Sequence, residues 1–388
     1  MNQFSLPRNT YYGRNALEQL ERLPGKRAAI VIGGGSMKKL GFLDKVHGLL
    51  KAAGMDVDIV ENVEPDPSIE TVMRGAKQMR KFNPDWIIGL GGGSAIDAAK
   101  AMWVFYEHPE LRFEQAIELD GVPSLRNKAR FAAIPSTSGT ASEVTTSAVI
   151  SDYASKTKYA LDSKELIPDL SILDPELAEA MPQKLAAFTG MDALTHALEA
   201  YAATLANPFS DAFAAAAAKL IMNNLPASYS GNPQGRELMH YAQCMAGIAF
   251  SNSMLGITHS LAHATGLVFN IPHGAGNVIF LPYVLQFNQK AAASKYALLA
   301  REMGLNGKNA AELSNSLCRE VAALRERLAI PASLKEYGVA EEHFEEELDA
   351  ITEKAISDPC TGTNPRPCSK TEIKQLFRYA FAGREIDF

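Results

Sequence analysis

The chain is poor in several features, and each shortage narrows its class. Its four cysteines are widely spaced and form no Cys-x-x-Cys pair, which favours reduced thiols and a cytoplasmic location over a disulfide framework. No apolar run approaches the roughly 18 residues of a membrane span, so no membrane partner is expected. No basic block stands out, which speaks against nucleic acid as a partner. The first fifteen residues lack the apolar stretch of a signal peptide.

The composition is that of a globular protein with a large core. Hydrophobic residues make up 47% and charged residues 21% of the chain, and the formal net charge is -6. A length of 388 residues makes two domains the natural expectation.

The first half of the sequence alternates between two kinds of segment. Short apolar runs at residues 27–32, 56–63, 85–90 and 130–135 read as strands. Helical segments at residues 37–54, 68–82 and 94–107 separate them, with Ser68 as a plausible N-cap. This alternation predicts a parallel sheet with right-handed crossovers, followed by short β pieces around residues 146–176.

After about Pro182 the rhythm becomes helical up to the C-terminus. The sequence therefore predicts an α/β dinucleotide-binding domain with a parallel sheet over residues 1–180. An all-α domain that binds metal and substrate is expected over residues 181–388. Ligands of open α/β sheets bind at the carboxyl ends of the strands.

A Gly-Gly-Gly-Ser turn occurs twice, at residues 33–36 and 91–94, each time after an apolar run. In the second copy, three glycines let the backbone approach a phosphate closely. Ser94 stands where an N-cap is expected, and a helix N-terminus favours an anion. The alternative is a tight strand-to-helix turn without a ligand.

Four of the eight histidines form a pattern with one aspartate. Asp192 and His196 are four residues apart, as are His259 and His263, so each pair shares one face of a helix. His273 follows a proline in what reads as a turn. One such pair is usually a surface contact, but two pairs in apolar surroundings favour a bound divalent cation. The residue types suit Fe(II), Zn(II), Mn(II) or Co(II), and spacing alone leaves open which histidine is not a ligand.

The chain resembles the iron-containing, group III alcohol dehydrogenases over nearly its whole length. The motifs that carry the resemblance are "IGLGGGSAIDAAK", "AIPSTSGTASEVT", "ATGMDALTHALEAY", "HSLAHATGLVFNIPHGAGNVIFLPYV" and "CTGTNPR". Within that family it looks most like lactaldehyde reductases, propanediol dehydrogenases and butanol dehydrogenases. The resemblance implies hydride transfer between NAD(P)(H) and a small primary alcohol or aldehyde, and a homodimer or larger homo-oligomer.

The resemblance also assigns roles to residues. It implies that Asp192, His196, His259 and His273 ligate one Fe(II), with Zn(II) as the alternative metal. His263 is then the non-ligand histidine near the nicotinamide and our candidate for the proton relay. The substrate pocket implied by the resemblance contains Ser147, Phe250 and Cys360. Ser147 replaces the asparagine of the lactaldehyde reductase type, which speaks against a 2-hydroxyaldehyde substrate.

The cofactor residues follow from the same resemblance. The resemblance implies that ten residues contact the cofactor at its pyrophosphate, at its nicotinamide side or elsewhere in its cleft. They are Gly91, Gly92, Gly93, Ser94, Asp97, Ser136, Thr137, Thr140, Thr145 and Lys158. The resemblance also implies that the first glycine turn, with Gly34, Gly35 and Ser36, faces the adenosine ribose. This turn lacks an acidic residue, and Lys38 and Lys39 follow it, which predicts a preference for NADP(H) over NAD(H).

Two alternative functions are less consistent with the sequence. A glycerol dehydrogenase- or dehydroquinate synthase-like metal enzyme would act on a different substrate or catalyse a non-redox net reaction, but those relatives use three protein ligands and zinc. A metal- or nucleotide-binding module without catalysis does not account for a chain that has both a cofactor turn and a complete ligand set.

Overall fold

The computed structural model describes residues 3–388. The chain forms two compact units, of which the first ends at Pro182 and the second begins at Gln183. The first unit contains all the strands among the described residues, and the second consists of helices.

A six-stranded parallel sheet forms the centre of the first unit. Its strands follow the order β1-β8-β5-β4-β2-β3, and every neighbouring pair is parallel. The strands are β1 (Asn9–Tyr12), β2 (Arg27–Ile32), β3 (Asp56–Val60), β4 (Trp86–Gly91), β5 (Arg130–Pro135) and β8 (Leu170–Leu173). A separate antiparallel hairpin consists of β6 (Ser147–Asp152) and β7 (Thr157–Asp162).

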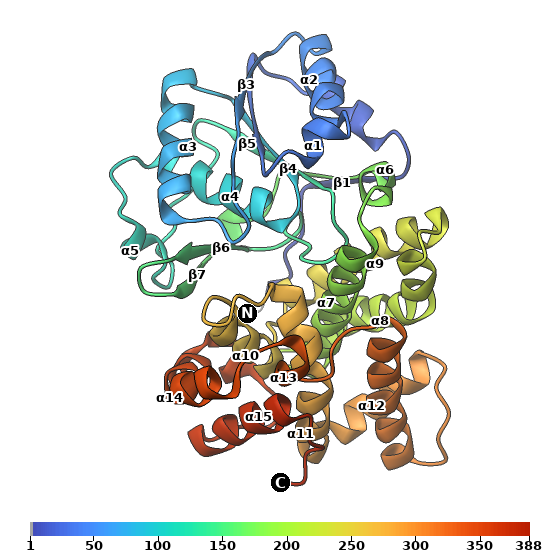
Figure 1. Cartoon of the computed structure of the whole chain (residues 1–388). Helices are drawn as coiled ribbons and strands as arrows, with labels where there is room; N and C mark the ends of the chain where they lie inside the picture. The colour runs from blue at the N-terminus through green and yellow to red at the C-terminus, as the bar shows by residue number, and fades with distance from the viewer. Residues whose placement is uncertain (1–2) are drawn as a thin grey trace. The chain divides into compact units, whose positions relative to one another are not determined.

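Both faces of the sheet are buried at its central strands, because helices cover them there. In β2, Ile30 packs in the hydrophobic cluster that includes residues of η1 (Ala16–Arg22) and α2 (Phe42–Ala52). Its neighbour Val31 packs in the other cluster, with residues of α3 (Ile69–Phe82) and α4 (Gly93–Glu107). Figure 1 shows α3 and α4 on one side of the strands and α2 on the other. Alternate residues of one strand therefore serve two cores, as expected for a parallel sheet covered on both faces.

The four predicted strands of the sheet are present as β2 to β5. The sheet also contains β8, which the sequence indicated only as a short β piece, and β1, which was not predicted. All four residues of β1 are exposed, and the strand has no alternating apolar pattern from which it could be predicted. The remaining elements of this unit are α1 (Ser36–Lys39), α5 (Phe113–Ala116), η2 (Lys164–Leu166) and α6 (Pro175–Glu179).

Of the two N-caps predicted in this unit, one is present and one is not, and one predicted helix is divided into two. Ser68 caps α3 as predicted, because its side chain accepts a hydrogen bond from the backbone N–H of Thr71 at 3.1 Å. The single helix expected over residues 37–54 is wrong: Gly41, with φ +78°, separates α1 from α2. Ser94 is not an N-cap either, since α4 begins at Gly93 and its N-cap is Gly92.

The second unit is all-helical and has one large hydrophobic core. Its helices are α7 (Gln183–Ala202), α8 (Pro208–Tyr229), α9 (Pro233–Ser251), α10 (Ile257–Gly266), α11 (His273–Glu302), α12 (Ala310–Arg327), α13 (Leu334–Tyr337), α14 (Glu341–Ser357), η3 (Pro359–Thr363) and α15 (Lys370–Ala382). The predicted fold class, a parallel α/β unit followed by an all-α unit, is confirmed.

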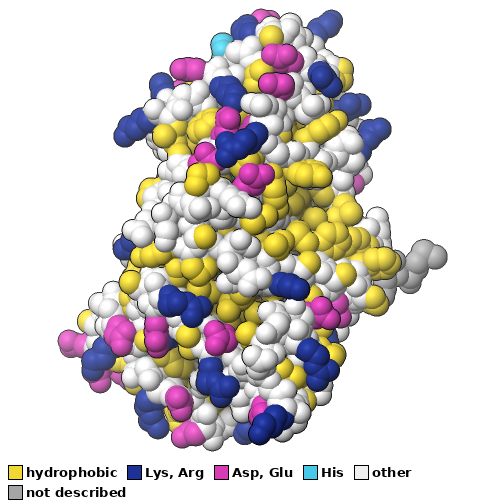
Figure 2. All heavy atoms as spheres, turned by 90° about the vertical axis from the view of Figure 1, so that its right-hand side faces the viewer, with side chains coloured by type: hydrophobic (Ala, Val, Ile, Leu, Met, Phe, Trp, Pro, Cys, Tyr) yellow, Lys and Arg dark blue, Asp and Glu magenta, His cyan; other side chains and the backbone are white. Residues whose placement is uncertain are grey.

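Within residues 3–388, no helix is both long and apolar enough to cross a membrane. On the face drawn in Figure 2, Lys and Arg side chains are interspersed with Asp and Glu side chains.

Candidate functional site

Three helices of the second unit bring the predicted metal ligands together. Asp192 and His196 lie one turn apart on α7, His259 lies on α10, and His273 is the first residue of α11. One potential ligand atom from each of the four lies within 4.8 Å of the others. The ring of His196 stacks on that of His259 at a centroid distance of 4.7 Å. His273 was expected in a turn, and the structure instead has it at a helix start with Pro272 as N-cap.

Glu199, which the sequence pattern did not single out, orients one of these imidazoles. Its carboxylate accepts hydrogen bonds from the Thr258 backbone N–H at 2.7 Å and from Nδ1 of His259 at 2.6 Å. Nε2 of His259 is therefore the nitrogen left to bind a cation. Burial raises the pKa of Glu199, and burial together with nearby His196 holds the pKa of His259 well below its usual value.

Asn277, one turn after His273 on α11, is a second polar residue that the sequence pattern did not single out. Its Nδ2 donates to Oδ1 of Asp192 at 2.7 Å and lies 3.0 Å from Nε2 of His259. The side chain is fully buried, and its Oδ1 has no hydrogen-bond partner among the described residues. Asn277 thus fixes the carboxylate of Asp192 within the cluster.

His263 lies beside the four residues rather than among them. Its ring stacks on that of His273 at 5.3 Å, and its Nδ1 lies 2.8 Å from Oδ2 of Asp358. Although burial acts to raise it, the imidazole of His263 and hydrogen bonds from Cys360 lower the pKa of Asp358 to about 2. The pair is therefore a carboxylate and an imidazole held at hydrogen-bond distance.

The three residues predicted for the substrate pocket divide between the two units. Phe250, on α9, stacks on His196 with ring centroids 4.5 Å apart. Cys360, in η3, can be grouped with His263 and Asp358, because potential ligand atoms of the three lie within 4.8 Å of one another. Ser147 is the first residue of β6 in the other unit.

The second glycine turn joins β4 to α4 at the carboxyl edge of the sheet. A Cβ atom on Gly93 would lie 2.6 Å from Oγ1 of Thr140, and one on Gly92 would lie 3.3 Å from Cγ2 of Thr137. The turn therefore packs directly against the segment of residues 136–145, and any side chain at position 93 would require Thr140 to move. The first turn of α4 contains no acidic residue, so its N-terminus suits an anion.

A buried lysine links α4 to the segment that contains Thr145 and Ser147, both of which hold residues predicted to bind the cofactor. Nζ of Lys100, on α4, donates to the backbone oxygens of Thr145 at 2.7 Å and Ser147 at 3.0 Å, and also contacts Oγ1 of Thr145. Burial lowers the pKa of Lys100 to about 8 and raises that of Asp97. Oδ2 of Asp97 accepts a hydrogen bond from the Val149 backbone at 3.1 Å. The hydroxyl of Thr145 is thus engaged by Lys100.

Lys158, on β7, pairs with an acidic residue of a neighbouring loop. Its Nζ lies 2.6 Å from Oδ1 of Asp66, and the lysine side chain is only 5% exposed. The backbone N–H of Asp66 in turn donates to Oγ of Ser94 at 3.3 Å. Lys158 is therefore linked to the glycine turn through Asp66.

The first glycine turn follows β2. Gly35 is the N-cap of α1 and Ser36 its first residue. A Cβ atom on Gly34 would meet no atom within 4 Å. The ammonium group of Lys38 lies 3.5 Å from Glu61, and both side chains are exposed.

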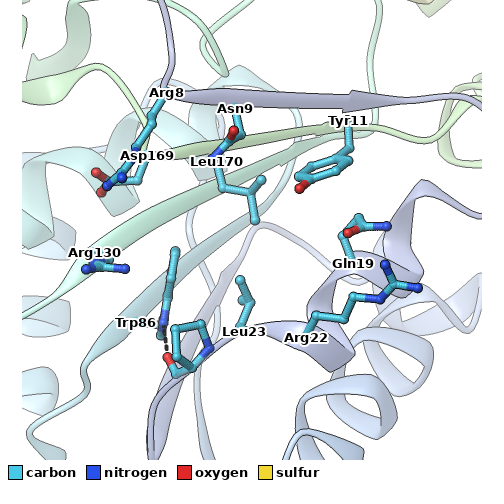
Figure 3. Close-up of a pocket in the computed structure, with 11 residues that line it drawn as sticks. Arg8, Asn9, Tyr11, Gln19, Arg22, Leu23, Trp86, Arg130, Asp169 and Leu170 are labelled. Atoms are coloured by element: carbon cyan, nitrogen blue, oxygen red, sulfur yellow. Dashed lines mark hydrogen bonds between the residues drawn. The ribbon is translucent and has the colours of Figure 1, made fainter.

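A cavity of about 330 Å³ lies at the opposite, amino-terminal ends of the strands. Figure 3 shows Arg8, Arg22 and Arg130 around it. The indole Nε1 of Trp86 donates to the carbonyl oxygen of Pro24 at 2.7 Å. None of the predicted site residues lines this cavity. Since ligands of such sheets bind at the carboxyl ends, this cavity is separate from the two glycine turns that are predicted to bind the cofactor.

The four converging residues fit a divalent first-row cation. One carboxylate and three imidazoles are suitable ligands for such ions, and Nδ1 of His196 is buried without a hydrogen-bond partner among the described residues. A set of this kind, with three of its four members buried, in one chain with an α/β glycine turn, is the arrangement expected of a metal-dependent, nicotinamide-linked dehydrogenase. Residues 7–175 match the model "Iron-containing alcohol dehydrogenase", and residues 186–381 match "Fe-containing alcohol dehydrogenase family, C-terminal". The chain belongs to the iron-containing alcohol dehydrogenase family, which confirms the resemblance.

Relatives and solved structures agree with this membership. The chain is 55% identical to an NADPH-dependent butanol dehydrogenase of Clostridium saccharobutylicum, over 100% of both chains. It is 39% identical to the bifunctional aldehyde-alcohol dehydrogenase AdhE of Escherichia coli, matching 98% of this chain and 46% of that protein. The iron-containing alcohol dehydrogenase structure from Thermococcus thioreducens superimposes with a TM-score of 0.91 at 37% identity, covering 98% of this chain and 100% of that one.

Proposed function

We propose that the protein catalyses the reversible, NADPH-preferring reduction of short-chain aldehydes to primary alcohols, with Fe(II) held by Asp192, His196, His259 and His273. The observation that carries this proposal is the convergence of these four residues within 4.8 Å. The 55% identity to the NADPH-dependent butanol dehydrogenase of Clostridium saccharobutylicum supports a short alcohol and NADPH. Zn(II) is the alternative metal.

The chemistry divides between the bound groups and the side chains. When bound, a divalent cation supplies Lewis-acid polarisation of the alcohol or carbonyl oxygen, and the nicotinamide supplies or accepts the hydride. Oxidation of the alcohol also releases one proton from its hydroxyl, and His263 is the group we assign to carry it. Phe250 and Cys360 limit the pocket to a short chain.

The cofactor preference rests on the first glycine turn. Gly34, Gly35 and Ser36 present no carboxylate that would repel a 2′-phosphate, and Lys38 and Lys39 add positive charge. Pairing of Lys38 with Glu61 reduces its contribution, so Lys39 is the more available ammonium group. For the other cofactor residues, we propose contacts from the second glycine turn and from the segment that contains Thr137 and Thr140. On the basis of family membership, we also propose that the protein is a homo-oligomer and is located in the cytoplasm.

The test uses protein prepared anaerobically and loaded with Fe(II) or Zn(II). Consumption of NADPH and NADH is followed with ethanal, propanal and butanal. We expect the kcat/KM with NADPH to exceed that with NADH about tenfold, equivalent to about 1.4 kcal/mol. A ratio near one would overturn the cofactor preference. No consumption with any of the aldehydes would overturn the function, and full activity with zinc alone would overturn the choice of iron.

A further inference from the structure

The segment after α14 reaches the helix that carries His263. Oδ2 of Asp358 lies 2.8 Å from Nδ1 of His263, and Oδ1 accepts from Oγ of Ser260 at 3.2 Å. Oδ1 also accepts the backbone N–H of Cys360 at 2.9 Å, which makes Asp358 the N-cap of η3. One carboxylate thus serves both as a helix cap and as the partner of an imidazole.

The hydrogen bond between Asp358 and His263 determines which ring nitrogen of His263 carries the proton. A carboxylate accepts and cannot donate, so the proton of neutral His263 lies on Nδ1. Nε2 is then the atom that can exchange a proton. The side chains of His263 and Asp358 are 24% and 14% exposed, so water competes little for this contact.

We propose that Asp358 is a positioning residue that fixes the tautomer and orientation of His263 for proton transfer. This inference rests on the proposed function, in which His263 carries the proton. Asp358 touches neither the substrate nor the cofactor in this proposal and acts through His263.

The test compares kcat, the KM of NADPH, metal content and thermal stability in variants of the full chain. Asp358→Asn retains a good N-cap, so it separates folding from the effect on His263. We expect Asp358→Asn to lower kcat about 10-fold and Asp358→Ala about 100-fold, which does not exceed the roughly 100- to 10,000-fold that a positioned acid or base contributes. Metal content and the KM of NADPH stay unchanged. Thr361→Val is the matched control, because it removes hydrogen bonds from the same segment to Ser260 and Ala355 but leaves the His263 contact.

A double variant decides whether Asp358 acts through His263. If it does, His263→Ala/Asp358→Ala has the same kcat as His263→Ala, because the two losses are not additive. Additive losses, or a loss in Thr361→Val equal to that in Asp358→Asn, would overturn the inference and assign Asp358 a structural role. Failure of the proposed function is distinct, since the wild-type protein itself would then consume no NADPH.

Discussion

The most direct test of the proposed metal centre is Glu199→Gln. This change keeps the shape of the side chain but removes the charge opposite Nδ1 of His259, 2.6 Å away. Loss of a carboxylate partner behind a ligating histidine typically weakens metal binding about 10–100-fold, or about 1.4–2.8 kcal/mol. Glutamine also has only one oxygen for the two donors, so one N–H stays unsatisfied and costs about 1–3 kcal/mol of stability.

The assay is competition for Fe(II) or Co(II) with a chromophoric chelator under anaerobic conditions. Glu107→Gln is the matched control, since Glu107 is also buried and accepts from Nε1 of Trp103 at 2.9 Å and from nearby backbone N–H groups. We expect this control to lose stability but not metal affinity. Unchanged metal affinity in Glu199→Gln, or equal losses in both variants, would refute the reasoning.

Three further changes test separate parts of the molecule. Gly34→Asp meets no steric obstacle and should lower the NADPH-to-NADH ratio of kcat/KM about tenfold; an unchanged ratio would contradict the role of this turn. His263→Ala should keep most of its metal while kcat falls about 100-fold, and metal loss as large as in His259→Ala would contradict the relay. Lys100 has its pKa lowered to about 8 by burial, so above that pH the unfolded chain binds a proton that the folded chain does not. Between about pH 8 and 10.5 the free energy of unfolding, measured by urea unfolding, should therefore have a more positive slope against pH in the wild type than in Lys100→Met, and equal slopes would contradict this expectation.

Local sequence patterns were enough to predict much of the fold and the group of candidate metal ligands. Strands β2 to β5 are apolar runs separated by helices, and i, i+4 spacing identified Asp192 and His196 as neighbours on one helix face. The division of roles among the histidines came from the family resemblance, not from the spacing.

The supporting residues were harder to find, because their partners are distant in sequence. Asp358 meets His263 across 95 positions, and no local pattern links the two. Asn277 likewise meets Asp192 only once the helices that carry them have packed together. Glu199 did leave a signal, since it lies three residues after His196 on the same helical face.

The position of β1 has a consequence for how the first unit assembles. Within residues 3–388, strand β1 pairs with β8 alone, from the other end of the unit's sequence, and β8 pairs with β5 through Ala132 and Ala133. During synthesis, β1 can pair with β8 only after almost the whole unit has been made. Such non-local pairing slows folding, and the open edge of β5 is exposed to aggregation until β8 arrives.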